Sequence, residues 1–148
     1  MADHDAADAG PRASHDPIAR AEQLESELRA AKGAAASREK QLILVMVGVL
    51  DGFRRLDRAV GSESLGDESR RLVERFGLLR KRLESSLERE GVTRINSLGL
   101  ATNPELHEVF DEREDASADA GTIVDVDEEG YLFRGAVLRR AKVTVAKT

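Results

Sequence analysis

Cysteine and tryptophan are absent from the 148-residue sequence, and aromatic residues make up only 3% of it. Without cysteine the chain has neither disulfides nor thiolate metal sites, which fits a reducing compartment, so we expect a cytoplasmic protein. The scarcity of aromatic side chains argues against a large globular interior. Long apolar runs are also missing. The longest, Leu42 to Leu50, is interrupted by Gly48 and is too short to span a bilayer, so we expect no membrane association.

A surplus of basic residues is missing as well. The net charge of -5 argues against a general nucleic-acid binder, because neutralising phosphates requires excess lysine and arginine. Asp3, Asp5 and Asp8 precede any basic residue, so the N-terminus resembles neither a secretory signal nor a transit peptide. Charged residues nevertheless make up 34% of the chain, which suits long solvated helices better than a compact enzyme domain.

A seven-residue repeat dominates the first part of the chain. Residues 1–17 are small, polar and acidic, and we expect a disordered tail there. Residues 18–60 then form one long predicted helix. Its apolar seam consists of Ala21, Leu28, Ala35, Leu42, Val49 and Leu56, with Leu24, Ala31, Val45 and Ala59 in the second position of the repeat. Such a seam is typical of a two-stranded coiled coil.

The apolar face of this helix widens after Lys40. A second apolar face is added by Ile43, Met46, Val47, Leu50 and Phe53, and a helix that is apolar on two sides needs more than one neighbour. Residues 61–90 hold a second amphipathic helix, which Ser64 or Asp67 would cap. Two such helices leave apolar surface uncovered, so we predict a homodimer with a four-helix bundle. The predicted dimerisation residues are Leu42, Val49, Leu56, Leu72, Phe76, Leu79 and Leu83.

The pattern changes at Gly91, which occupies the position of a left-handed helix cap. Residues 91–148 are predicted to form a small C-terminal β domain, which makes the fold class α+β. The segments expected first are a strand over Val92 to Leu98, a short helix over Glu105 to Phe110 after Pro104, and an acidic loop over Asp111 to Ala120.

Three further strands are predicted near the end of the chain. They are Thr122 to Val126, Tyr131 to Phe133 and Lys142 to Lys147, and Asp127 to Gly130 is expected to turn the first hairpin. In the last strand, Val143 and Val145 alternate with polar or small residues, so we expect one buried side.

The sequence carries no convincing catalytic motif. His107 with Glu108 and Asp111 is the nearest approach to a metal or acid–base site, but no second local histidine or cysteine completes it. Arginines of the second helix alternate with glutamates, which favours a solvated face over a nucleic-acid contact. We therefore expect no enzyme activity, no cofactor, no metal and no small-molecule substrate.

Four stretches of the sequence resemble the GrpE family, the nucleotide exchange factors of DnaK-type chaperones. Together they run approximately from Leu42 to the end, and their order and spacing are more specific than any one of them. They are Val49 to Leu56, Leu87 to Ile95, Asn103-Pro-Glu-Leu-His-Glu108, and the closing module with Gly121 to Val124, Glu129 to Tyr131 and Val137 to Lys147. The predicted first helix is shorter than the family's and lacks its aromatic–Asn–Arg-rich stretch.

The resemblance implies a parallel dimer whose β domain binds the nucleotide-binding domain of a DnaK-type chaperone. Binding would favour the open cleft, so that ADP leaves. By the family match, Gly91, Pro104 and His107 lie near the partner, and Arg139 is either a contact or part of the scaffold. Two alternatives remain open: a coiled-coil dimeric adaptor for another protein, and a specialised GrpE-like paralogue without exchange activity.

Overall fold

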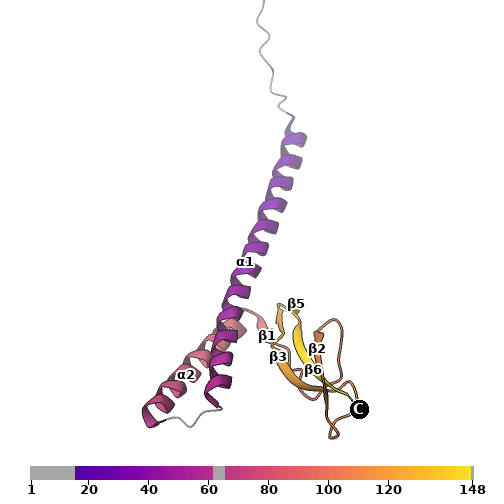
Figure 1. Cartoon of the computed structure of the whole chain (residues 1–148). Coiled ribbons are helices and arrows are strands. Elements are labelled where there is room, and N and C mark those ends of the chain that lie inside the picture. The colour runs from indigo at the N-terminus through magenta and orange to yellow at the C-terminus, as the bar shows by residue number, and fades with distance from the viewer. Residues whose placement is uncertain (1–15, 62–65, 148) are drawn as a thin grey trace, which may run out of the picture. The chain divides into compact units, whose positions relative to one another are not determined.

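The computed structural model describes residues 16–61 and 66–147 of the chain. Most of the predicted acidic tail and the candidate cap Ser64 lie outside these residues. Helix α1 spans Pro17–Gly61 and helix α2 spans Asp67–Arg89 (Figure 1). The strands are β1 Val92–Arg94, β2 His107–Glu114, β3 Ile123–Glu128, β4 Tyr131–Phe133, β5 Ala136–Arg139 and β6 Ala141–Lys147. A long helix, a second helix and a small β module confirm the predicted α+β class. The four predicted segment boundaries and the dimeric bundle stay predictions.

Contacts divide the chain into two units, residues 1–39 and residues 40–148. In the first unit, the described residues belong almost entirely to α1, and residues 16–38 are all exposed. Exposure of Leu24 and Leu28 is what a coiled-coil segment presents in a single chain, because its seam is covered only by a second helix.

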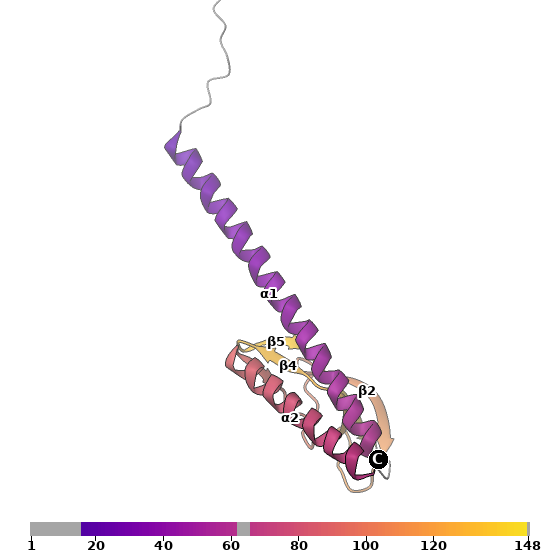
Figure 2. The same ribbon diagram turned by 90° about the vertical axis from the view of Figure 1, so that its left-hand side faces the viewer.

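The second unit contains the rest of α1, packed beside α2 (Figure 2). Ile43, Val47 and Leu50 form a buried stripe at helical spacing on α1. This stripe packs with Leu87 of α2 and with three strand residues, Val92, Tyr131 and Leu138. The chain's own α2 and β module therefore cover part of the second apolar face predicted after Lys40. Of its other two residues, Phe53 is partly buried and Met46 is 39% exposed.

Helix α2 begins at Asp67 and ends at Arg89. Asp67 is its first residue and not its cap; Gly66 occupies the cap position, and no side chain caps the helix. The acidic Asp67 and Glu68 in the first turn suit the positive end of the helix dipole. At the other end Gly91 has a φ of +88°, as predicted for the left-handed residue after a helix.

The β module consists of two three-stranded sheets, in the orders β1-β4-β5 and β2-β6-β3. All neighbours are antiparallel except β2 and β6, which are parallel. The predicted hairpin at Asp127 to Gly130 is wrong, because β3 and β4 pair in different sheets and this segment leads from one sheet to the other. The tight turn lies instead at Arg134 and Gly135, before β5, a strand that the sequence analysis missed.

The predicted helix over Glu105 to Phe110 is also wrong. Only one turn forms after Pro104, where the amides of Leu106 and His107 donate to the carbonyl of Asn103. From His107 the chain becomes strand β2, because pairing with β6 satisfies its backbone groups. The acidic segment from Asp111 to Glu114, predicted as loop, belongs to this strand.

Strand β6 is buried on both sides in its second half, not on one side as expected. Val143 and Val145 join a small core with Ile123 and Ala141, whereas Thr144 and Ala146 are buried on the other side. The Thr144 hydroxyl donates to the Asp127 carboxylate over 2.8 Å, so the buried polar side chain is satisfied. Such burial fits the central position of β6 between β2 and β3.

Candidate partner-binding surface

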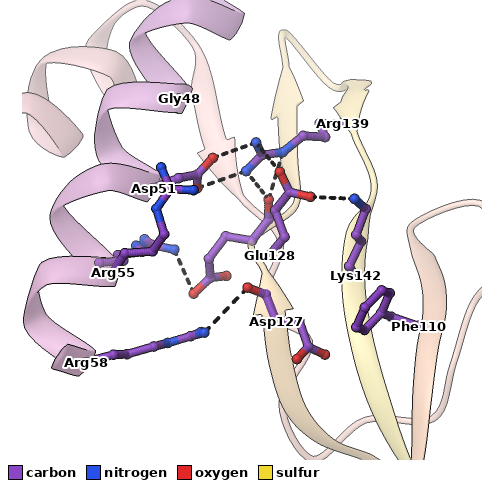
Figure 3. A pocket seen from close by; sticks show the side chains of 11 residues that line it. Gly48, Asp51, Arg55, Arg58, Phe110, Asp127, Glu128, Arg139 and Lys142 are labelled. Carbon is purple, nitrogen blue, oxygen red and sulfur yellow. Dashed lines mark hydrogen bonds and ion pairs between the residues drawn. The ribbon is translucent and has the colours of Figure 1, made fainter.

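Arg139, at the end of β5, connects the β module to helix α1. Its Nη1 and Nη2 atoms donate to the two Asp51 oxygens over 2.6 and 3.0 Å (Figure 3). Nη1 also lies 2.9 Å from a Glu128 oxygen, and Nε and Nη2 donate to the Glu129 carbonyl over 3.1 and 2.7 Å. A guanidinium has five N–H donors, and these five contacts match that number.

The charge state of Arg139 follows from these contacts. Burial alone would lower its pKa, but the hydrogen bond and negative charge of Asp51 and the charge of Glu128 outweigh burial and raise the pKa. Arg139 therefore stays protonated. With its donors committed inside the chain, the geometry favours the scaffold alternative over the contact alternative, while a role in partner binding stays a prediction.

A second ion-pair group joins both helices to the β module. Arg54 on α1 reaches Glu84 of α2 over 3.0 Å and Glu129 over 2.7 Å, and only 14% of its side chain is exposed. Arg80 of α2 lies 3.2 Å from Asp57 on α1 and 3.0 Å from Glu84. The charged face of α2 is thus solvated only in part, because some of its residues bridge the helices.

The predicted contact residues Pro104 and His107 lie beside the β5–β6 junction. The Pro104 carbonyl accepts from Arg140 over 3.4 Å, and His107 pairs with Ala141 in the parallel ladder. Pro104 is exposed, whereas His107 is only 5% exposed. The backbone amide of Asn103 donates to His107 Nδ1 over 2.9 Å, and burial lowers the pKa of His107. His107 therefore acts as a neutral hydrogen-bond acceptor that holds the turn.

Gly91 lies in a different part of the β module. Its carbonyl accepts from the Arg134 amide, and a Cβ added to it would lie 3.2 Å from the Arg134 side chain. The structure therefore brings Pro104 and His107 together beside Arg140 and Ala141, but gives Gly91 its contacts at the β4–β5 turn. Gly91 and His107 each have a structural reason for their identity, whereas Pro104 contributes a backbone carbonyl. The partner contacts of all three stay predictions.

The predicted dimerisation residues divide into two groups. Five are exposed in the single chain, with fractions from 38% for Leu56 to 59% for Leu42; the others of this group are Val49, Leu72 and Leu79. Phe76 and Leu83 are partly buried: Phe76 lies 6.3 Å from the Phe53 ring, and Leu83 packs on the main core. The helices thus carry an uncovered apolar stripe, as a helix with a missing neighbour does.

Sequence reasoning missed Asp51, Glu129 and Phe110 as surface-forming residues. Asp51 carried one available signal, since it is a lone carboxylate within the apolar segment from Ile43 to Phe53. Its partner is 88 residues away, and no local pattern joins the two. Phe110 is 68% exposed at an irregularity in the β2–β6 register, where a bulge re-aims the side chain.

The described residues contain no group of three or more histidine, aspartate or glutamate side chains arranged to hold a metal ion. Neither of the two described helices has the length and hydropathy needed to cross a membrane.

Comparisons with known proteins agree with the resemblance. The family model described as GrpE matches residues 18–147. A protein GrpE of Pelodictyon phaeoclathratiforme is 32% identical over 120 residues, which cover 80% of this chain and 58% of that protein. A protein GrpE of Chlorobium phaeobacteroides is 40% identical over 81 residues, or 55% of this chain and 43% of that protein. A third, of Teredinibacter turnerae, is 31% identical over 154 residues, covering 89% and 80%. The chain thus spans about half the length of the first two relatives.

Proposed function

Because this chain belongs to the GrpE family, we propose that it is a co-chaperone that binds the nucleotide-binding domain of a DnaK-type chaperone and promotes ADP release. The observation that carries the proposal is the family match, which extends over both helices and the whole β module. Action in the cytoplasm is part of the proposal, in keeping with a chain that lacks cysteine.

The mechanism needs no acid, base or nucleophile. A factor that binds the open cleft of an ATPase more tightly than the closed cleft shifts the ATPase toward the open state, and ADP leaves faster. Each tenfold shift requires about 1.4 kcal/mol of differential affinity. A rigid binding surface serves this purpose, since a surface that adapted to both states would not discriminate between them. The ion pair of Arg139 with Asp51 on α1 and the ion pair of Arg54 on α1 with Glu129 in the β module support such rigidity.

The proposed active form is a homodimer. Exposed apolar side chains on both helices, among them Leu42, Val49 and Leu79, support a bundle of four helices built from two copies. The exposed seam of residues 16–38 supports a paired coiled coil.

Stopped-flow release of fluorescent ADP from a DnaK-type chaperone tests the proposed function. Saturating protein should accelerate release. If release is not accelerated although the chaperone binds, the chain is a specialised paralogue without exchange activity. If the chaperone does not bind at all, the dimeric adaptor alternative replaces the proposal.

The loop residues require a second experiment. Pro104→Ala combined with His107→Ala should slow exchange, because both residues shape the turn proposed to face the partner. His107 is buried, so the pair can also loosen the β module. The exposed Pro104→Ala single variant separates these effects, since it should slow exchange without lowering the melting temperature. Unchanged exchange in both variants would remove this loop from the contact surface.

A further inference from the structure

A pocket of about 510 Å³ lies between the C-terminal part of α1 and the β module. Gly48, Asp51, Arg55 and Arg58 line it from one face of the helix, at spacings that place them in a row. Phe110 and Lys142 lie on the opposite side (Figure 3). The pocket contains five cationic side chains and four carboxylates.

The carboxylates in this pocket are already engaged. Asp51 is held by Arg139, and Glu128 lies 2.9 Å from Arg139 and 3.1 Å from Lys142. Glu129 pairs with Arg54, and the Asp127 carboxylate accepts from the Thr144 hydroxyl. A cationic ligand would therefore have to break existing contacts before it found an anion.

Two of the cations, Arg55 and Arg58, have no carboxylate partner among the described residues. Arg55 is exposed and makes no hydrogen bond or ion pair with any residue in the described part of the chain. Arg58 donates to the backbone carbonyls of Val126 and Asp127 over 2.6 and 3.5 Å, and has no carboxylate partner among the described residues. In Figure 3 the carbonyl of Asp127, not its carboxylate, faces Arg58. The helix side of the pocket thus offers two guanidinium groups to an incoming anion.

Phe110 adds an apolar contact on the side of the pocket opposite these charges (Figure 3). Its ring is 68% exposed, although a large apolar side chain usually avoids water. A guanidinium pair on one side of the pocket and an exposed ring on the other fit a carboxylate on an apolar stem, as glutamate presents, because the fork of arginine matches carboxylate geometry.

We infer that this pocket, between Arg55 and Arg58 on one side and Phe110 on the other, is a docking site for an acidic side chain of the chaperone's ATPase domain. The inference rests on the proposed function and specifies where and by what chemistry the partner binds. Charge complementarity selects an acidic partner segment over a basic one, because the pocket's own carboxylates are engaged. Docking there would involve α1 and the β module at once, across the junction that Arg139 holds together.

Arg55→Glu is the most informative substitution, since Arg55 is exposed and makes no hydrogen bond or ion pair in the described structure whose loss could unfold the chain. Affinity for the nucleotide-free ATPase domain should fall about tenfold, by lost attraction and new repulsion. The affinity of the Arg55→Gln variant should fall by less, and Phe110→Ala should also weaken binding. Arg82→Glu is the matched control: it reverses the charge of an exposed arginine on α2 and should leave affinity unchanged.

Titration calorimetry at two salt concentrations distinguishes docking from a structural effect. Binding by the wild-type chain should weaken with salt, and Arg55→Glu should weaken less steeply because one attraction is already gone. Equal affinity of Arg55→Glu and wild type would overturn the inference while leaving the proposed function intact. Absence of wild-type binding would refute the proposed function and the inference with it. A variant that weakens dimerisation in sedimentation, but not chaperone binding, would assign this face to a second copy and overturn the inference.

Discussion

Arg139 on β5 binds both carboxylate oxygens of Asp51 on α1, with distances of 2.6 and 3.0 Å. Both side chains are mostly buried, with exposed fractions of 22% and 17%. A two-point contact of this kind fixes orientation as well as distance. It therefore holds the β module in one position on the helix, which a binding surface composed of both elements requires.

Arg139→Ala should destabilise the chain by about 3 kcal/mol, because it leaves the Asp51 carboxylate largely buried without its partner. Arg139→Lys should recover only part of this loss, since an ammonium group cannot span two oxygens as a guanidinium does. Urea unfolding at fixed protein concentration measures the loss of stability in each of the two variants. A double-mutant cycle with Asp51→Ala should give a coupling energy of about 1–3 kcal/mol.

Arg113→Ala is the control for this cycle. Arg113 lies 3.8 Å from Asp125, and both side chains are more than half exposed. Its removal should change stability by less than about 0.5 kcal/mol. A coupling energy for Arg139 and Asp51 below about 0.5 kcal/mol would show that the contact does not hold the β module.

The sequence predicted the elements better than their pairing. Both helices, Gly91 and the strand at Tyr131 to Phe133 were identifiable from local patterns, because periodicity and turn chemistry depend on near neighbours. The false hairpin at Asp127 to Gly130 and the parallel pairing of β2 with β6 have a different origin. Sheet order depends on contacts between segments far apart in the chain, which no local pattern reveals.

The candidate surface shows the same limit. Arg139 was identifiable as a notable residue, but Asp51 and Glu129 turned out to be its partners only once the chain was folded. The helix predicted after Pro104 failed for a related reason. A proline followed by polar residues suits a helical first turn, yet pairing with β6 gave the backbone a better alternative one turn later.

Gly130→Ala should be strongly destabilising. A Cβ at this position would lie 2.6 Å from the Ala141 backbone nitrogen and 2.9 Å from Ile95 Cδ1, so the strand or the core must shift. Overpacking against backbone should cost about 2–3 kcal/mol in unfolding free energy. Gly33→Ala makes the same chemical change in an exposed helical position with nothing within 4 Å. That variant should be stabilising by about 1 kcal/mol, and the same sign of effect in both would contradict the close approach at Gly130.

Leu79→Glu should weaken the proposed dimer at least about tenfold, because it places a charge in the predicted seam. Leu79 is 52% exposed in the single chain, so the substitution should leave the fold of each copy intact. Leu78→Glu is the matched control, since Leu78 is 67% exposed and lies outside the predicted seam. Sedimentation equilibrium measures both association constants. If the two variants associate equally well, the predicted seam is not the interface.

His107 should make the stability of the β module depend on pH. Burial lowers its folded-state pKa below the ordinary value of 6.5, and its Nδ1 accepts a hydrogen bond from Asn103 only while unprotonated. Below pH 6.5 the unfolded chain therefore binds more protons than the folded chain. The stabilisation from neutral His107 is complete above that pH and is lost as pH falls toward the folded pKa.

His107→Asn keeps an acceptor near Nδ1 but does not titrate, so between about pH 7.5 and about pH 5.5 its melting temperature should fall less than that of wild type. His4 and His15 are common to both proteins and cancel in the difference. An equal fall of the melting temperature in both proteins between the two pH values would therefore exclude a neutral, turn-holding His107.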